Sequence, residues 1–146
     1  MSSIKVYQAN QIGGCVTVIT AEVDGATHRI MIDYGRSLKG HENAEEFFYP
    51  WNEDPIDAVF FTHYHGDHVG RLLEIPKEIP LYIGSAARQV MINIQRSLAN
   101  MKDTEEVEIH RQELEVLMDD DRVHSFNWNG SCYDAVELPG FRVEPY

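Results

Sequence analysis

The first 33 residues alternate between apolar and polar positions, as strands with one buried face do. Residues 4–8, 15–23 and 27–33 form three such runs. Asp24-Gly25 lies between the second and third runs and is a pair typical of a tight hairpin turn. The pattern therefore predicts that the chain begins with antiparallel strands.

The spacing of apolar residues changes in the middle of the chain. Residues 56–62, IDAVFFT, are a continuous apolar run, typical of a strand buried on both faces, and residues 80–84 predict another strand. Residues 85–101 and 105–118 have the apolar spacing of helices. The residues expected to face inward are Ala87, Val90, Met91, Ile94, Leu98 and Met101 on the first helix, and Val107, Leu114 and Leu117 on the second. Strand patterns return at 122–128, 134–138 and 141–145, which indicates an α/β fold with a mixed sheet.

Two shorter helices are predicted where proline interrupts the pattern. Residues 41–51 favour a helix that ends at Pro50, and residues 67–75 favour one that stops before Pro76.

Composition narrows the class of protein. The chain has 146 residues, which suits a single domain spanning 1–146, and no apolar run is long enough for a membrane span. No signal peptide precedes the first strand, so we expect a cytoplasmic protein. The net charge of −12 opposes binding to phosphate backbones, although nucleic acid as a partner stays open. The two cysteines, Cys15 and Cys132, are expected to be reduced, buried thiols.

The segment that follows strand 56–62 carries the candidate chemistry. Residues 62–70 read THYHGDHVG and place His63, His65, Asp67 and His68 within six residues. Imidazole and carboxylate are ligands for zinc, manganese or iron. Side chains two apart at a strand end point to the same side, so His63 and His65 can reach one metal. Asp67 and His68 follow the flexible Gly66 and can turn toward a second metal.

The remaining histidines have a simpler interpretation. His28, His41, His110 and His124 are isolated in the sequence, and each is expected to be a packed or surface residue. Four polar groups gathered after a buried strand are a different case, because they would be costly to bury without a metal. The histidine loop therefore predicts a metal site.

The segment FFTHYHGDHVG resembles the T-H-x-H-x-D-H-x-G signature of the metallo-β-lactamase superfamily, most of whose members are two-metal hydrolases. The early hairpin, IMIDYG with Asp33 at a strand end, and PIDAVFFTH are similar to the N-terminal half of that family in order and spacing. The glycine pair before CVTVI and the IPLYIG strand resemble the ribonuclease J-like branch.

The resemblance implies a metallo-β-lactamase-like αββα sandwich, of which this chain would be the N-terminal half, with a mixed sheet and helices on one face. It implies that His63 and His65 bind the first Zn²⁺ and that Asp67 and His68 bind the second, with Mn²⁺ or Fe as other candidates. Asp67 would also orient the attacking group, and Asp33 would support the loop by hydrogen bonding; Asp33 can equally be a simple turn residue. The implied activity is hydrolysis of a small-molecule ester, a thioester or a phosphodiester by a metal-bound hydroxide.

The ligand count leaves a second hypothesis open. The family's sites add a third histidine to the first metal, a bridging aspartate and a last histidine. Here His124 lies inside a predicted strand, and Asp134 lacks the expected glycine-rich setting, so both are weak candidates. The chain can therefore also be interpreted as a catalytically incomplete half-domain that binds metal or self-associates through an exposed sheet face.

Overall fold

The computed structural model describes residues 2–9, 13–38, 49–101 and 105–145, and its main feature is a single six-stranded sheet. The order of the strands is β1-β2-β3-β4-β5-β6. The first three strands are antiparallel and the last three are added in parallel, which confirms the predicted mixed sheet. The strands are β1 (Ser2–Tyr7), β2 (Val16–Val23), β3 (Ala26–Ile32), β4 (Ala58–Phe61), β5 (Leu81–Gly84) and β6 (Val123–Phe126).

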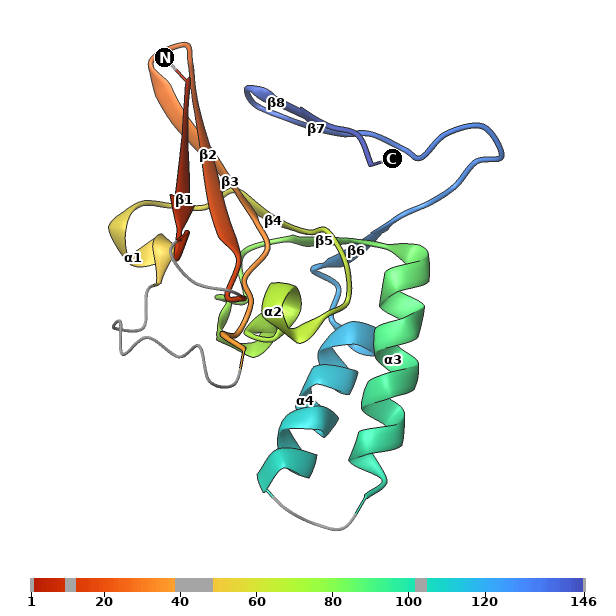
Figure 1. Cartoon of the computed structure of the whole chain (residues 1–146). Coiled ribbons are helices and arrows are strands. Elements are labelled where there is room, and N and C mark those ends of the chain that lie inside the picture. The colour runs from red at the N-terminus through yellow and green to blue at the C-terminus, as the bar shows by residue number, and fades with distance from the viewer. Residues whose placement is uncertain (1, 10–12, 39–48, 102–104, 146) are drawn as a thin grey trace.

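Three helices lie on one side of strands β4 to β6, as the resemblance implied (Figure 1). These are the short α2 (Gly66–Val69), α3 (Ser85–Ala99) and α4 (Glu105–Asp119). A one-turn helix, α1 (Pro50–Glu53), precedes β4, and a 3₁₀ turn, η1 (Leu72–Glu74), follows α2. None of the helices in the described ranges is both long and apolar enough to cross a bilayer.

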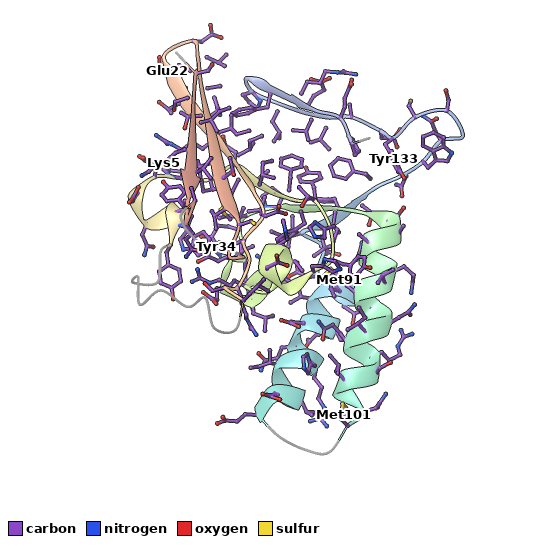
Figure 2. The ribbon with its side chains drawn as sticks, in the orientation of Figure 1. Lys5, Glu22, Tyr34, Met91, Met101 and Tyr133 are labelled. Atoms are coloured by element: carbon purple, nitrogen blue, oxygen red, sulfur yellow. The ribbon has the colours of Figure 1, made fainter. Side chains whose placement is uncertain are left out.

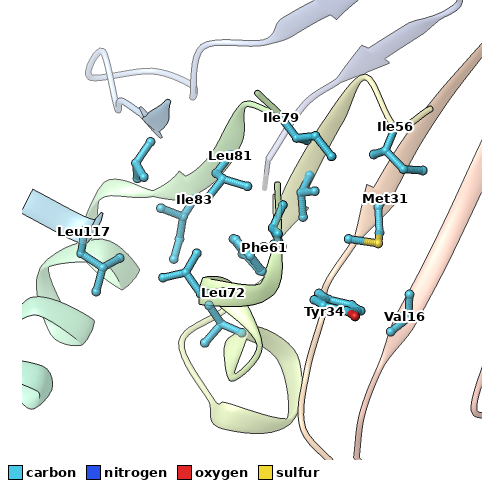
Figure 3. Packing of buried hydrophobic residues seen from close by; sticks show 14 of the residues in the cluster. Val16, Met31, Tyr34, Ile56, Phe61, Leu72, Ile79, Leu81, Ile83 and Leu117 are labelled. Carbon is cyan, nitrogen blue, oxygen red and sulfur yellow. The ribbon is translucent and has the colours of Figure 1, made fainter. Parts of the chain in front are cut away.

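The main core lies between the sheet and these helices (Figure 3). Every residue of β4 is buried, which confirms the prediction from the continuous apolar run. Met31 of β3 and Tyr34 just after it have no exposed surface, and Leu117 contributes from α4. Burying side chains of this size provides most of the free energy that holds sheet and helices together.

A second, smaller hairpin packs on the other face of the sheet. It consists of β7 (Val136–Leu138) and β8 (Phe141–Val143). Its apolar residues cover a cluster that contains Ile30, Phe60 and Phe126. Figure 2 shows side chains filling the space between this hairpin and the sheet. The two strands were predicted, but their position over the sheet was not. The face expected to be open is therefore covered in part.

Three local predictions were wrong in detail. The helix expected to end at Pro50 begins there in the described part of the chain, because proline fits the first turn, where no intrahelical N–H bond is needed. Residues 41–48 of that prediction lie outside the described residues. The helix expected over 67–75 is divided into α2 and η1.

The third correction concerns α3 and α4. Met91 is buried, but Val90 and Ile94 are 37% and 41% exposed and Met101 is 63% exposed. Helix α4 packs beside α3 on its Arg88 side, where the Arg88 guanidinium donates to the carbonyl of Leu117, so the buried face is rotated from the predicted one. On α4, Val107 and Leu117 are buried as expected, whereas Leu114 is only half-buried.

Candidate metal centre

The histidine loop begins where β4 ends and is held by the turn that follows β3. The backbone N–H of Tyr34 donates to the carbonyl of His68 at 2.7 Å, and that of Arg36 donates to the carbonyl of Gly66 at 2.9 Å. From the start of β2, the N–H of Cys15 donates to the carbonyl of Asp67 at 3.0 Å. Three hydrogen bonds from two neighbouring segments therefore fix the backbone of the candidate ligands.

Asp33 is the polar centre beneath this loop. It is 4% exposed, and its φ of +60° places it in the left-handed region, which aspartate tolerates better than most residues. Its Oδ1 accepts from the backbone N–H of Thr62 at 2.8 Å. Its Oδ2 accepts from the Thr62 hydroxyl and lies 2.8 Å from His68 Nδ1. Asp33 is thus a buried acceptor that joins both ends of the loop, not a simple turn residue.

This network determines where the imidazole protons lie. An ionised carboxylate can only accept, so His68 Nδ1 carries a proton, and in the neutral imidazole its Nε2 then keeps a lone pair. The single Thr62 proton is donated to Asp33, so the Thr62 oxygen accepts from His63 Nδ1 at 3.0 Å. His63 Nε2 also keeps its lone pair. The hydrogen bonds therefore give both histidines the tautomer in which Nε2 can bind a metal.

The four predicted ligands lie close together. The ring centroids of His63 and His68 are 3.9 Å apart, and those of His63 and His65 are 4.8 Å apart. His68 Nε2 lies 3.6 Å from Asp67 Oδ2. Two ligand atoms about 2.1 Å from one zinc ion are separated by about 3.4 Å in a tetrahedral site. Asp67 and His68 are therefore spaced as a pair that could share one ion.

The imidazole and carboxylate groups are chemically suited to a divalent metal, but their atoms do not surround a single ion position. Among the described residues, no three histidine, cysteine, aspartate or glutamate side chains are arranged so that they could hold an ion together. His65 is exposed, and its ring makes edge contacts with His63 and Tyr64. The assignment of the four ligands to two metals stays a prediction.

Electrostatics favours the neutral form of His63. Partial burial lowers the pKa of His63, and the neighbouring His68 and His65 lower it further, whereas Asp33 and Asp67 act in the opposite direction. Neutral imidazole is the form that binds metals. Burial, with Asp33 and Asp67 nearby, raises the pKa of the Cys15 thiol, so Cys15 is not set up as a thiolate.

The other candidates lie elsewhere. His124 is within β6, as predicted, and its ring packs against Tyr82 with centroids 5.0 Å apart. The N–H of Asp134 donates to the carbonyl of Asn127, on the segment that leads to β7. His28 Nδ1 lies 3.1 Å from Asp57 Oδ2, and His110 Nδ1 lies 2.7 Å from Gln95 Oε1. These positions agree with packed or surface roles; His41 lies outside the described residues.

Sequence reasoning missed two residues that support the loop, and it overestimated the burial of both cysteines. The Thr62 hydroxyl donates to Asp33 and accepts from His63. Its place directly before the first histidine could have indicated that it supports the loop. Arg71 is buried, with its guanidinium 4.2 Å from the Tyr34 ring and paired with Glu74, and no pattern in the sequence indicated its burial. Both cysteines are free as predicted, but neither is buried: Cys15 is half-buried, and Cys132 is exposed because it lies in a turn held by the Asn129 side chain.

Comparison with known proteins places this arrangement in a family. A solved structure from Enterococcus faecalis V583, described as a protein of unknown function, has a similar fold with a TM-score of 0.61 at 16% sequence identity. The match covers 99% of this chain and 37% of that one, so the present chain spans well under half the length of that relative. No match was found among curated proteins. The family model described as the metallo-beta-lactamase superfamily matches residues 14–120, which include the whole histidine loop, and the chain therefore belongs to the metallo-beta-lactamase superfamily.

Proposed function

We propose that this chain carries the ligand-bearing part of a metal-dependent hydrolase. The observation that supports this most directly is the network of Asp33, Thr62, His63 and His68, which leaves the Nε2 lone pairs of both neutral imidazoles free, that of His68 3.6 Å from Asp67 Oδ2. A network built only for stability would not need two histidines in the same tautomer at the end of a buried strand. Membership of the family agrees with this proposal.

In this proposal His63 and His65 hold one metal, and Asp67 and His68 hold another, with Zn²⁺ favoured and Mn²⁺ or Fe as alternatives. When bound, such metals lower the pKa of a water molecule and polarise the bond to be cleaved. Asp33 keeps the proton of His68 on Nδ1 and fixes the ring, and Thr62 does the same for His63. Asp67 would also orient the attacking group.

Three finer points belong to the same proposal. The chain would correspond to the N-terminal half of the family's sandwich, which agrees with its match to only 37% of a solved structure of similar fold. A ribonuclease J-like branch rests on sequence features alone, and so does the cytoplasmic location. The substrate would be a small-molecule ester or a phosphodiester.

Metal dependence is the first prediction. We expect saturable binding of Zn²⁺ or Mn²⁺ by isothermal titration calorimetry, and hydrolysis of p-nitrophenyl butyrate or bis-p-nitrophenyl phosphate only after metal is added. EDTA should remove the activity, and added metal should restore it. Turnover that is insensitive to EDTA would contradict the proposal. Metal bound without turnover would favour the incomplete metal-binding module.

A second candidate function, self-association, is favoured by one observation. Ile4 and Val6 of β1 are 68% and 56% exposed. Their cross-strand partners on β2 are Ile19 and Thr17, and Ile19 belongs to the cluster beneath the β7–β8 hairpin. Directly paired residues share a face of a sheet, so Ile4 and Val6 extend this apolar face beyond the hairpin. We propose that a second copy of the chain covers it.

Gel filtration with light scattering tests self-association. We expect a dimer at micromolar concentration that shifts toward monomer in Ile4→Lys. Ser3→Lys is the matched control, since it adds the same charge to the opposite face of the same strand and should leave the dimer intact. A monomer at all concentrations of the unmodified protein would reject the proposal.

A further inference from the structure

A cavity of about 400 Å³ lies beside the histidine loop, at the carboxyl ends of the parallel strands. Phe61 and Thr62 contribute from the end of β4, and Gly84 from the end of β5. Thr62 is the residue whose hydroxyl joins Asp33 to His63, so the cavity shares a wall with the candidate metal centre. Ligands of α/β proteins bind at this edge of the sheet, and the volume is in the range of small-molecule sites.

The walls of this cavity are mostly apolar. Phe60 and Phe126 come from the sheet, Ala86 and Ala87 from the first turn of α3, and Val143 from the hairpin. The charged residue at the wall is Glu144, and the Arg142 side chain donates to it. No lysine or arginine lines the cavity within the described residues. Glu144 is already paired with Arg142, so a flanking phosphate of a nucleic acid would meet no unpaired cation in this cavity, which favours an uncharged, apolar group there.

The apolar surface continues out of the cavity along α3. Val90 and Ile94 follow Ala87 at spacings of three and four, so they lie on the same side of the helix. Both are more than a third exposed, at 37% and 41%. An exposed apolar row that begins at an apolar cavity is a feature of a binding surface rather than of a solvated helix face.

We infer that this cavity binds the apolar portion of a neutral substrate, so that the proposed hydrolase acts on a carboxylic ester with an aromatic or acyl group rather than on a nucleic-acid phosphodiester. The inference rests on the proposed function for its reaction, but the binding site stands on the cavity alone. The apolar group would lie against Phe60, Phe126 and Ala87, which would bring the ester carbonyl next to Thr62 and the histidine loop.

The test measures binding without metal, so that it is independent of catalysis. N-phenyl-1-naphthylamine, a neutral apolar dye, is titrated into the protein in EDTA and followed by fluorescence. Gly84→Phe fills the cavity, since a Cβ at Gly84 meets no atom within 4 Å and its φ is −57°. We expect dye affinity to fall by about ten-fold or more, which is the effect of losing one well-packed apolar contact.

Glu108→Phe adds the same ring to an exposed position of α4, away from the cavity and from Val90 and Ile94, and is the control, expected to bind dye as the unmodified protein does. Ala86→Phe, at an exposed wall position, is a second filling variant if Gly84→Phe does not fold. Ethyl hexanoate should displace the dye and bis-p-nitrophenyl phosphate should not. Equal dye affinity in the filled variants and the control, or displacement by the phosphodiester alone, would overturn the inference. Absence of metal binding in the earlier test would remove the proposed reaction but leave this result unchanged.

Discussion

Gly35→Ala is expected to destabilise the protein by about 3 kcal/mol or more, because the new side chain has nowhere to go. A Cβ at Gly35 would lie 1.7 Å from the carbonyl oxygen of Asp67 and 2.5 Å from the backbone nitrogen of His68. These are backbone atoms of the histidine loop and cannot rotate away as a side chain could. The turn or the loop must move, and either movement breaks hydrogen bonds between them.

The substitution should also weaken metal binding at the proposed centre. The neighbours of Gly35 hold the loop: Tyr34 donates to His68, and Arg36 donates to Gly66. Displacing this turn shifts Asp67 and His68 relative to His63, and supporting residues of metal sites typically change affinity by about 10–100-fold. Urea denaturation measures the free energy of unfolding, and calorimetric titration with Zn²⁺ measures the affinity.

Gly66→Ala is the matched control, since it makes the same change within the histidine loop against which Gly35 packs. A Cβ at Gly66 meets no atom within 4 Å, and Gly66 begins α2, where alanine is favourable. We expect its unfolding free energy to stay within about 0.5 kcal/mol of the unmodified protein. If Gly35→Ala were as stable as Gly66→Ala, the close packing of the turn against the loop would be wrong.

The parts of the fold that could be predicted are those that depend on the local pattern of apolar, polar and turn residues. The all-buried run of β4, the Asp24-Gly25 hairpin and the spacing of α3 and α4 each produce the expected element. Periodicity shows which face of an element is apolar, but it does not show which element will cover that face. Val90 and Ile94 were therefore expected in the core, whereas α4 packs on the other side of α3 and leaves them exposed.

The candidate site also has a part that could be predicted from the sequence and a part that depends on the tertiary fold. His63, His65, Asp67 and His68 are adjacent in sequence, so their proximity follows from the chain itself. Asp33 is 35 residues from His68, and its contact depends on the parallel pairing of β3 and β4. A family resemblance suggested it, but residue spacing alone could not distinguish it from a turn residue. The cavity beside Thr62 depends on strands β4, β5 and β8 together, and no local pattern records it.

His65→Ala is expected to abolish metal-dependent turnover and to weaken Zn²⁺ binding by about 100-fold while the fold stays intact. His65 is exposed at the start of α2, and its imidazole makes no hydrogen bond within the described ranges. Its loss should therefore change the unfolding free energy by no more than about 0.5 kcal/mol. His68→Ala would be a poorer test, because it would also remove one of the three hydrogen bonds of the buried Asp33 carboxylate, leaving only the two from Thr62, and so combine two effects.

The control for this variant is His28→Ala. His28 is also an imidazole near the surface, but it lies on β3 and pairs with Asp57, away from the loop. Calorimetric titration and the ester assay on both variants separate a ligand from a general loss of histidine. Reduced affinity in His65→Ala alone identifies His65 as a ligand, and unchanged affinity would remove it from the site. If affinity falls while neither the variant nor the unmodified protein turns over substrate, then the loop binds metal in this chain without completing an active site, because further ligands are needed to close the coordination around each ion.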